Sequence, residues 1–276
     1  MSERTSTVKK CVAGAAAAGL LLSLLLPRLL RGGGEIQAAS VPRTSAGVVA
    51  LTFDDGPRRK TTQPLLDGLA QRGIPATFFL IGLKIPGNED LVRRMEAEGH
   101  QVGIHAQNHN MLVSPETVGT EVIPLRNTLA GLLGHSDFMV RPPYGKTTQE
   151  VRARLGAPVI LWSVDPEDWS DTDTRRQVTH IVSRVKDGDI ILLHDVYPSS
   201  VETALQAVDL LRKRGFYFVT VEELFALRGV EPQEGEIYRC LPMQLSTSAV
   251  RNCCAVGRQV VPHRWATRFR SQRQQT

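Results

Sequence analysis

Two adjacent carboxylates are the first residues along the chain whose type and spacing suggest chemistry. Asp54 and Asp55 follow the apolar run VVALTF (residues 48–53) and precede Gly56-Pro57, which signals a turn. The run predicts a buried strand, so both carboxylates stand at its carboxyl end. Because their charges repel, a protein tolerates such a pair when something binds one of them. An ordinary Asp-Asp-Gly turn after an edge strand is the alternative on these residues alone.

His105 and His109 add two imidazoles four residues apart. On one helical turn or in a tight loop they can face a common point and bind a metal ion, with an Asp from the strand at 48–53 as a charged third ligand. Two histidines and one carboxylate leave a coordination position for water, which the cation acidifies toward neutral pH. Without that carboxylate, the pair fits two solvated surface histidines better.

From residue 48 onward, predicted strands and helices alternate. The alternation indicates about seven β/α units around a parallel sheet, open or closed into a barrel. Strands are expected at residues 48–53, 76–82, 101–106, 138–141, 158–164, 189–194 and 216–221. Helices are expected at residues 61–72, 89–98, 115–133, 147–155, 174–186, 201–214 and 222–227.

Ligands of such folds bind at the carboxyl ends of the strands. Chemically capable residues gather at these ends, whereas chance placement would scatter them. Besides the first Asp pair, they are His105, Arg141, Asp165, Asp168 and His194-Asp195. Taken singly, Arg141 suits an ordinary ion pair and His194 a satisfied buried histidine, so the prediction depends on their joint placement.

Five motifs occur in order along the chain: TFDDGP (52–57), H-x-x-x-H (105–109), R-P-P-Y (141–144), D-x-x-D-W (165–169) and L-L-H (192–194). In order and separation they resemble the polysaccharide deacetylases, the NodB-homology domain of carbohydrate esterase family four. The likeness covers nearly all of the predicted domain, residues 41–229. It implies an α/β fold, a distorted (β/α)7-type barrel with the active site at the C-terminal ends of the strands.

The resemblance implies a role for each matching residue. Asp55, His105 and His109 are similar to the ligands of one divalent metal ion, for which zinc is expected and cobalt is the alternative. Asp54 resembles the general base that takes a proton from the attacking water. Arg141 is similar to the arginine that orients this base, and its cation would keep Asp54 charged.

The remaining motif residues resemble groups that act on the substrate. The backbone N–H of Tyr144 is similar to the donor that helps hold the oxyanion. His194 resembles the general acid that protonates the leaving amine, and Asp168 the carboxylate that raises its pKa. Trp169 and Leu192 resemble the walls of a small pocket for the acetyl methyl group.

The substrate implied is an acetylated polysaccharide, either a chitin-type oligomer or peptidoglycan, from which N-acetylglucosamine residues lose acetate. An amine leaves poorly unless it is protonated, so His194 with Asp168 favours amides over esters. An O-acetyl esterase acting on xylan is the alternative, as is a non-catalytic carbohydrate-binding relative, although pure binding would need neither Asp54 nor His194.

Two other enzyme classes fit part of the pattern. A phosphatase could use Asp54 as its nucleophile, but it would leave the two histidines unexplained. A non-haem iron oxygenase also uses two histidines and one carboxylate, but the β/α alternation differs from its usual all-β scaffold. Release of acetate from an acetylated glycan separates these classes from a deacetylase.

The sequence departs from the family pattern beside its histidines. The family usually has Ser or Thr after the first motif histidine, where this chain has Ala106, and Asn110-Met111 replaces a Pro-containing continuation. We expect the missing hydroxyl to weaken the ordering of the loop without loss of the metal.

The charge balance argues against a nucleic-acid partner. The chain carries a formal charge of +5, yet residues 41–229 hold 21 Lys and Arg against 23 Asp and Glu. The folded part is therefore near neutral, whereas nucleic-acid binding requires a basic face. We expect a monomer.

The N-terminal 40 residues resemble a secretory signal. Polar residues 1–10 precede the apolar stretch 11–26, and Ala38-Ala39 offers small residues for cleavage. An uncleaved membrane anchor that continues through Leu29 and Leu30 is the alternative. Either way, the protein is expected to be secreted or located at the cell surface or in the periplasm.

Residues 230–276 are expected to form a basic tail. It contains Cys240, Cys253 and Cys254, whereas Cys11 is the only other cysteine. The predicted domain therefore has no thiolate metal site or disulfide framework. In an oxidising compartment one tail pair can form a disulfide and leave one thiol spare; a disordered tail is the favoured alternative.

Overall fold

Strand β1 (Gly47–Asp54) is the centre of the structure, a computed structural model that describes residues 46–243. It pairs in parallel with three strands, β2 (Thr77–Ile81), β5 (Ile190–His194) and β6 (Phe216–Val219). All eight of its residues are buried. A parallel strand covered on both faces requires a continuous apolar sequence, which explains the run at 48–53.

The pairing of parallel strands extends beyond this centre. The main sheet has the order β3-β2-β1-β5, with β3 at Gln101–Ala106, and β6 pairs with β1 outside that path. A second sheet consists of β4 (Val159–Ile160) and β7 (Ile237–Tyr238). Single parallel bridges connect the strands further, at Ile104–Val140, Val140–Val159 and Val164–Ile191. The predicted α/β fold is confirmed, while closure into a seven-unit barrel is represented only by these bridges and stays a prediction.

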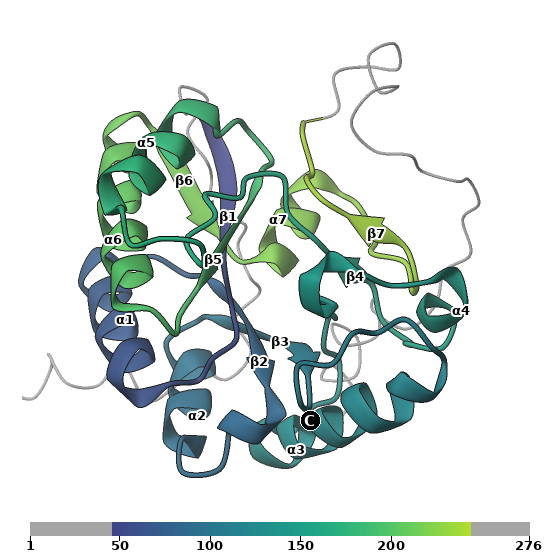
Figure 1. The fold of residues 1–276 in the computed structure, drawn as a ribbon. Helices are drawn as coiled ribbons and strands as arrows, with labels where there is room; N and C mark the ends of the chain where they lie inside the picture. Colours follow the sequence, from purple (N-terminus) through teal and green to yellow (C-terminus); the bar gives the residue numbers. More distant parts are fainter. Residues whose placement is uncertain (1–45, 244–276) are drawn as a thin grey trace, which may run out of the picture. The chain divides into compact units, whose positions relative to one another are not determined.

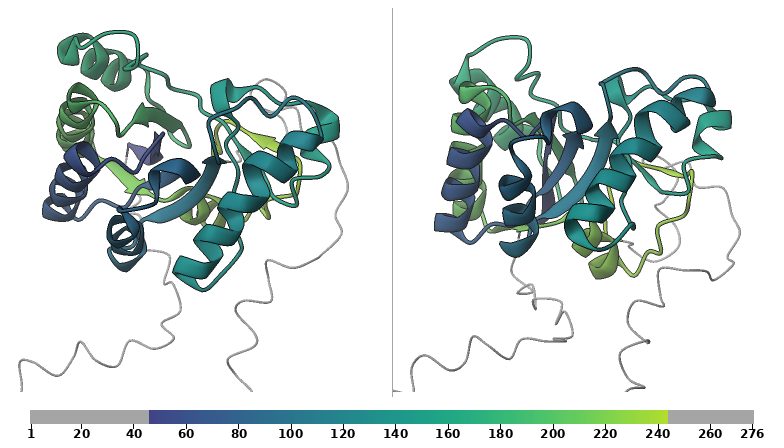
Figure 2. Two further views of the ribbon diagram at one scale, coloured as in Figure 1. Left: turned by 60° about the horizontal axis from the view of Figure 1, so that its bottom comes forward. Right: turned by 90° about the horizontal axis from the view of Figure 1, so that it is seen from below.

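The helices cover the sheet on both sides. α1, α5 and α6 lie together on one side of β1, and α7 lies on the other (Figure 1). α2 and α3 continue the outer layer next to α1 (Figure 2). The α-helices are α1 Arg59–Arg72, α2 Glu89–Ala97, α3 Ile123–Leu133, α4 Gln149–Arg152, α5 Thr174–Arg184, α6 Pro198–Lys213 and α7 Val221–Arg228. Short 3-10 helices occupy Gly82–Lys84 and Pro143–Gly145.

Side chains of successive residues in β1 point to opposite faces of the sheet, as the two-residue period of a strand requires. Val49, Leu51 and Phe53 belong to the large core beneath the outer helices. Val48 and Ala50 belong to a smaller cluster that includes Leu224 and Phe225 of α7. Thr52 and Asp54 continue this second face toward the carboxyl end, where polar chemistry replaces apolar packing.

Two predicted strands are shorter than expected. The segment 138–141 forms only single bridges at Val140, and only Val159–Ile160 of the segment 158–164 is regular. Both segments remain buried for most of their length. Apolar composition predicted their burial correctly, but it does not report how many ladder hydrogen bonds a strand makes.

The single helix predicted at 115–133 has two parts. Residues Val118–Val122 form a π-helix, and α3 begins at Ile123. Pro124 explains the change, because it has no N–H to donate to the carbonyl four residues before it and its ring crowds that carbonyl. A proline near the middle of a helical pattern therefore shifted the register instead of ending the helix.

The fold continues past residue 229, where the basic tail was expected to begin. β7 pairs with β4, and the ring of Tyr238 packs edge-on against Phe225 with centroids 4.7 Å apart. The N–H of Leu241 donates to the carbonyl of Gly188 at 2.7 Å. Few apolar residues mark this segment in the sequence, so its docking was not predictable from composition.

The predictions for the N-terminal 40 residues and for Cys253 and Cys254 lie outside the described residues. Between residues 46 and 243, no helix is long and apolar enough to cross a membrane.

The close packing of β3 against β2 gives a stability prediction. A Cβ added at Gly103 would lie 2.6 and 2.7 Å from ring carbons of Phe79 and 3.2 Å from the Met139 carbonyl oxygen. Gly103→Ala should therefore lower the free energy of unfolding by about 1–3 kcal/mol, measured by chemical denaturation. Gly131→Ala in α3 meets nothing within 4 Å and is the matched control, expected to raise stability by up to about 1 kcal/mol. Equal stability of the Gly103 variant and the wild type would contradict the described packing.

Candidate functional site

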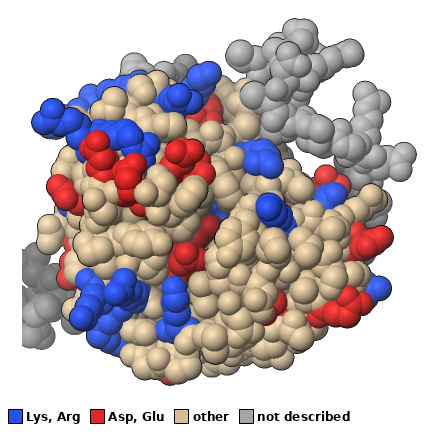
Figure 3. Space-filling view, viewed as in Figure 1, with Lys and Arg blue, Asp and Glu red and all other residues tan. Residues whose placement is uncertain are grey.

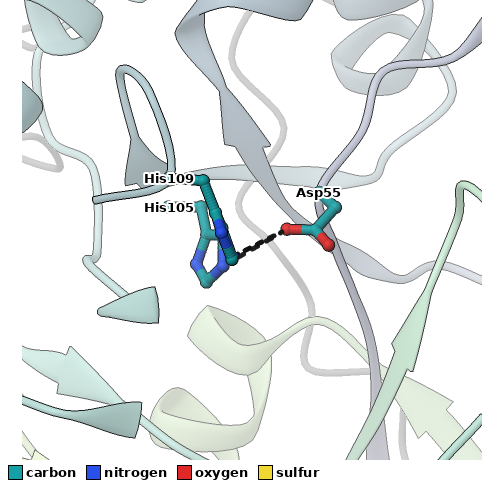
Figure 4. A group of neighbouring side chains, drawn as sticks. All are labelled: Asp55, His105 and His109. Atoms are coloured by element: carbon teal, nitrogen blue, oxygen red, sulfur yellow. Dashed lines mark ion pairs between the residues drawn. The ribbon is translucent and has the colours of Figure 1, made fainter. Parts of the chain in front are cut away.

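Asp55, His105 and His109 converge at the carboxyl ends of β1 and β3. The Nε2 atoms of His105 and His109 each lie 3.4 Å from Oδ1 of Asp55. The centroids of the two imidazole rings are 5.1 Å apart, and both rings lie on the same side of the Asp55 carboxylate (Figure 4). One potential ligand atom from each residue lies within 4.8 Å of the others, and no second such group occurs in the part of the chain that the structure describes. The predicted triad is therefore brought together.

The donor set fits a divalent cation. Oδ1 of Asp55 is inaccessible to solvent and has no hydrogen-bond partner. An unpaired buried carboxylate oxygen is costly, and a cation among the three side chains would satisfy it. Two imidazole nitrogens and one carboxylate oxygen are ligands typical of a catalytic zinc site.

His105 is held in the tautomer that a metal requires. Its Nδ1 lies 2.7 Å from the backbone carbonyl of Arg141. A carbonyl only accepts hydrogen bonds, so Nδ1 carries the hydrogen and the lone pair of Nε2 faces Asp55. Burial lowers the pKa of His105 to about 3, which keeps the ring neutral. Nδ1 of His109 lies 3.2 Å from the Tyr144 hydroxyl.

Asp54 forms a buried ion pair with Arg141. Nη1 of Arg141 donates to Oδ1 of Asp54 at 2.8 Å and to the hydroxyl of Thr52 at 2.7 Å. The other guanidinium nitrogens donate to the carbonyls of Ile160 and Leu161, each at 3.1 Å. Burial raises the pKa of Asp54 above its ordinary value, while the charge and hydrogen bond of Arg141 lower it. Asp54 is thus a fixed carboxylate with a raised affinity for a proton.

His194 and Asp168 form a second ion pair across the site. Nδ1 of His194 and Oδ1 of Asp168 are 2.8 Å apart, and the other Asp168 oxygen accepts the His194 backbone N–H, also at 2.8 Å. Burial lowers the pKa of His194, but the hydrogen bond and charge of Asp168, aided by Asp54 and Asp55, outweigh burial and raise the pKa to about 9. The imidazole is therefore protonated at neutral pH.

Unusual backbone conformations mark the loops that carry these groups. Four non-glycine residues among those described have positive φ: Asp55 at 75°, His109 at 66°, Tyr144 at 60° and Glu167 at 56°. Each belongs to a different one of the motifs recognised in the sequence. Such conformations are disfavoured for residues with a Cβ and concentrate at functional sites.

The expected substrate-facing residues differ in exposure. Tyr144 and Trp169 are exposed, with 61% and 58% of their surface accessible. Leu192 is buried on β5, opposite Thr52 of β1. Of the two predicted walls of the acetyl pocket, only Leu192 is therefore enclosed in this structure.

Two polar residues of the site, Thr52 and Glu121, were given no role from the sequence, and a third, Asp195, was noted only for its place at the end of a strand. Thr52 holds Arg141, and its two-residue spacing from Asp54 on a strand was the available signal. Asp195 is fully buried and accepts a 2.5 Å hydrogen bond from the hydroxyl of Thr62, and burial raises its pKa to about 7. Glu121 is buried and accepts hydrogen bonds from the loop that carries His109. The position of Asp195 directly after the strand predicted at 189–194 was its only signal, and no local pattern distinguishes Glu121 from a surface acid.

Comparison with known proteins points to one family. The family model described as "Polysaccharide deacetylase" matches residues 42–157. The peptidoglycan-N-acetylglucosamine deacetylase PgdA of Listeria monocytogenes is 33% identical over 74% of this chain and 44% of its own length. The chitooligosaccharide deacetylase of Bradyrhizobium sp. (strain ANU 289) is 39% identical over 56% of this chain and 73% of its own. This chain therefore spans less than half the length of the Listeria relative.

A solved structure supports the same grouping. The family 4 acetyl xylan esterase from Clostridium thermocellum, in complex with a cobalt ion, superposes with a TM-score of 0.67 at 30% identity. The match covers 71% of this chain and 99% of that one. The shared α/β architecture thus extends over nearly the whole esterase domain.

The His194–Asp168 pair gives a prediction about titration. In the metal-free protein His194 should titrate near pH 9. Asp168→Asn should lower this pKa by about one unit or more, because an adjacent opposite charge is removed. Since the folded pKa lies above the unfolded value of about 6.5, the pair stabilises the fold below pH 6.5 and loses this contribution as the pH rises toward 9.

Imidazole NMR titration measures the change. Asp137→Asn removes an exposed carboxylate and is the matched control, expected to leave the pKa of His194 unchanged. An unshifted pKa in Asp168→Asn would contradict the described cause.

Proposed function

This chain belongs to the polysaccharide deacetylase family, and on that premise we propose that it is a metal-dependent hydrolase that removes acetyl groups from N-acetylglucosamine residues of a polysaccharide and releases acetate. One observation carries the proposal. A candidate metal triad with an unpaired buried carboxylate oxygen has a buried base, Asp54, and a protonated histidine, His194, close by.

Asp54, Arg141 and the metal triad would act on the attacking water. A divalent metal held by Asp55, His105 and His109 would lower the pKa of a bound water and polarise the acetyl carbonyl. Asp54 would accept the proton of the attacking water, and Arg141 fixes the orientation of its carboxylate. Burial makes Asp54 a stronger base than an exposed aspartate, which suits general base catalysis near neutral pH.

Tyr144, Leu192, Trp169 and the His194–Asp168 pair would act on the acetyl group and its leaving amine. The backbone N–H of Tyr144 would donate to the developing oxyanion, and Leu192 and Trp169 would flank the methyl group. His194 would give its proton to the departing nitrogen. The raised pKa of His194 keeps that proton available at neutral pH, and Asp168 fixes the ring that delivers it.

Amide hydrolysis explains the His194–Asp168 pair better than ester hydrolysis does. An alcohol leaves without an acid far more readily than an amine, so an esterase has less need of a histidine held protonated by Asp168. Activity on O-acetylxylan is the alternative, since the similar structure from Clostridium thermocellum bears the name of an acetyl xylan esterase.

The glycan and the location follow as parts of the same proposal. The names of the relatives suggest peptidoglycan or a chitin-type oligomer. Residues 1–40 resemble a signal or anchor, which suits an enzyme that is secreted or held at the cell surface or in the periplasm. On the face shown in Figure 3, acidic and basic side chains are interspersed, as expected for a partner other than nucleic acid. Zinc is the metal proposed, with cobalt as an alternative.

Product analysis tests the function. The zinc-loaded protein should release acetate and an equal amount of free amine from N-acetylglucosamine oligomers or from peptidoglycan. A chelator should abolish this activity, and zinc or cobalt should restore it. Acetate release from acetylated xylan alone, with no amine from any N-acetylated glycan, would reject the amidase proposal, and full activity without metal would reject the metal.

Substitutions of the two adjacent aspartates should have different effects on zinc affinity and kcat. Asp54→Asn should retain zinc and lower kcat by about 10²–10⁴-fold, because it removes a general base. Asp55→Ala should lose zinc affinity, because it removes a charged ligand. Isothermal titration calorimetry measures the zinc affinity of each variant, and steady-state kinetics measures its kcat. Asp137→Asn is the control. Equal zinc affinity of both variants would show that the roles are wrongly assigned.

A further inference from the structure

Glu121 is a buried acid that the proposed chemistry does not use. It lies on the π-helix Val118–Val122, and only 1% of its surface is accessible. Its carboxylate accepts the backbone N–H of Asn108 at 2.7 Å, the side-chain amide of Asn108 at 3.0 Å and that of Asn110 at 2.7 Å. The residue between these two asparagines is His109.

The loop that carries His109 requires support from outside itself. His109 follows β3 and adopts a positive φ of 66°, a strained conformation for a residue with a Cβ. Ala106, which directly follows His105, has no hydroxyl that could form a hydrogen bond with the loop. His109 is also partly exposed, so burial holds it less firmly than it holds His105.

The π-helix supplies this support through backbone and side chain together. The carbonyl of Glu121 accepts the N–H of Gln107 at 2.7 Å, so the loop is bonded on both sides of His109 by one residue. The π-helix ends at Val122, two residues before Pro124 in the first turn of α3. Isolated π-turns inside helices are frequent at functional sites. Here the π-helix carries the carboxylate that contacts the loop.

A carboxylate fits this position better than an amide of the same shape. Three N–H groups point at its two oxygens, and an ionised carboxylate only accepts hydrogen bonds. Burial raises the pKa of Glu121, but the hydrogen bonds from Asn108 and Asn110 outweigh it and keep the pKa below the ordinary glutamate value. A glutamine would keep one acceptor oxygen but would turn an NH2 donor toward at least one of these N–H groups.

We propose that Glu121 is a positioning residue for the metal ligand His109: by bonding Gln107, Asn108 and Asn110, it fixes the imidazole where it can share a cation with Asp55 and His105. The inference rests on the proposed metal site and goes beyond it, because it assigns a supporting role to a residue outside the recognised motifs. Groups that orient a metal ligand typically change metal affinity when they are removed.

Zinc affinity of the metal-free protein tests the proposal. Glu121→Gln should weaken zinc binding by about 10–100-fold, measured by competition with a chromophoric chelator. It should also change the visible absorption of the cobalt-loaded protein, which reports ligand geometry. Glu116→Gln is the matched control, because it makes the same change at an exposed site of the same segment, and it should bind zinc as the wild type does.

A double-mutant cycle separates positioning from general support of the fold. If Glu121 acts through His109, Glu121→Gln should change zinc affinity by less than about twofold in a His109→Ala background. An equal loss in both backgrounds would overturn the proposal in favour of a purely structural role. Wild-type affinity and an unchanged cobalt spectrum in Glu121→Gln would also overturn it.

A milder variant tests the proposal even if Glu121→Gln does not fold. Asn110→Ala removes one donor to Glu121 at an exposed residue and should weaken zinc binding by about 3–10-fold, the effect of one hydrogen bond. Unchanged zinc affinity of this variant would count against the proposal. A wild-type protein that binds no zinc would reject the metal site itself, whereas zinc binding that is indifferent to Glu121 and Asn110 would reject only the positioning role.

Discussion

The buried guanidinium of Arg141 is the interaction on which the site depends. It bonds Asp54 and Thr52 of β1 and packs 4.2 Å from the ring of Phe79 on β2. Its own backbone carbonyl fixes His105 on β3. A fully buried cation is tolerable only when it is paired and hydrogen-bonded, and removal of one partner leaves an uncompensated charge. Arg141 therefore couples the proposed base Asp54, the proposed metal ligand His105 and the packing of three strands.

The two adjacent aspartates have different surroundings because β1 ends between them. Asp54 is the last residue of the strand, and its side chain follows the strand period inward to Arg141. Asp55 has a positive φ, which turns its carboxylate toward the two histidines. The repulsion between neighbouring carboxylates is relieved on one side by an arginine and, in the proposed function, on the other by a cation.

Much of the site was predictable because its residues sit in short segments of fixed geometry. The buried strand before Asp54 and the spacing of His105 and His109 place the triad correctly. Single-residue contacts between distant segments were not predictable. Glu121 reaches its loop only through the π-helix before Pro124, and residues 230–243 dock through β7. Their sequences carry no period that distinguishes them from a surface helix and a tail.

In the proposed function, Asp55, His105 and His109 bind one metal ion while Asp54 keeps its hydrogen bond to Arg141. Anomalous diffraction at the zinc edge from zinc-loaded crystals tests it most directly. The expected result is a single anomalous peak about 2.0–2.2 Å from one carboxylate oxygen of Asp55 and the Nε2 atoms of both histidines, with Asp54 still bonded to Arg141. A peak located elsewhere, or one with Asp54 as a ligand, would contradict the account.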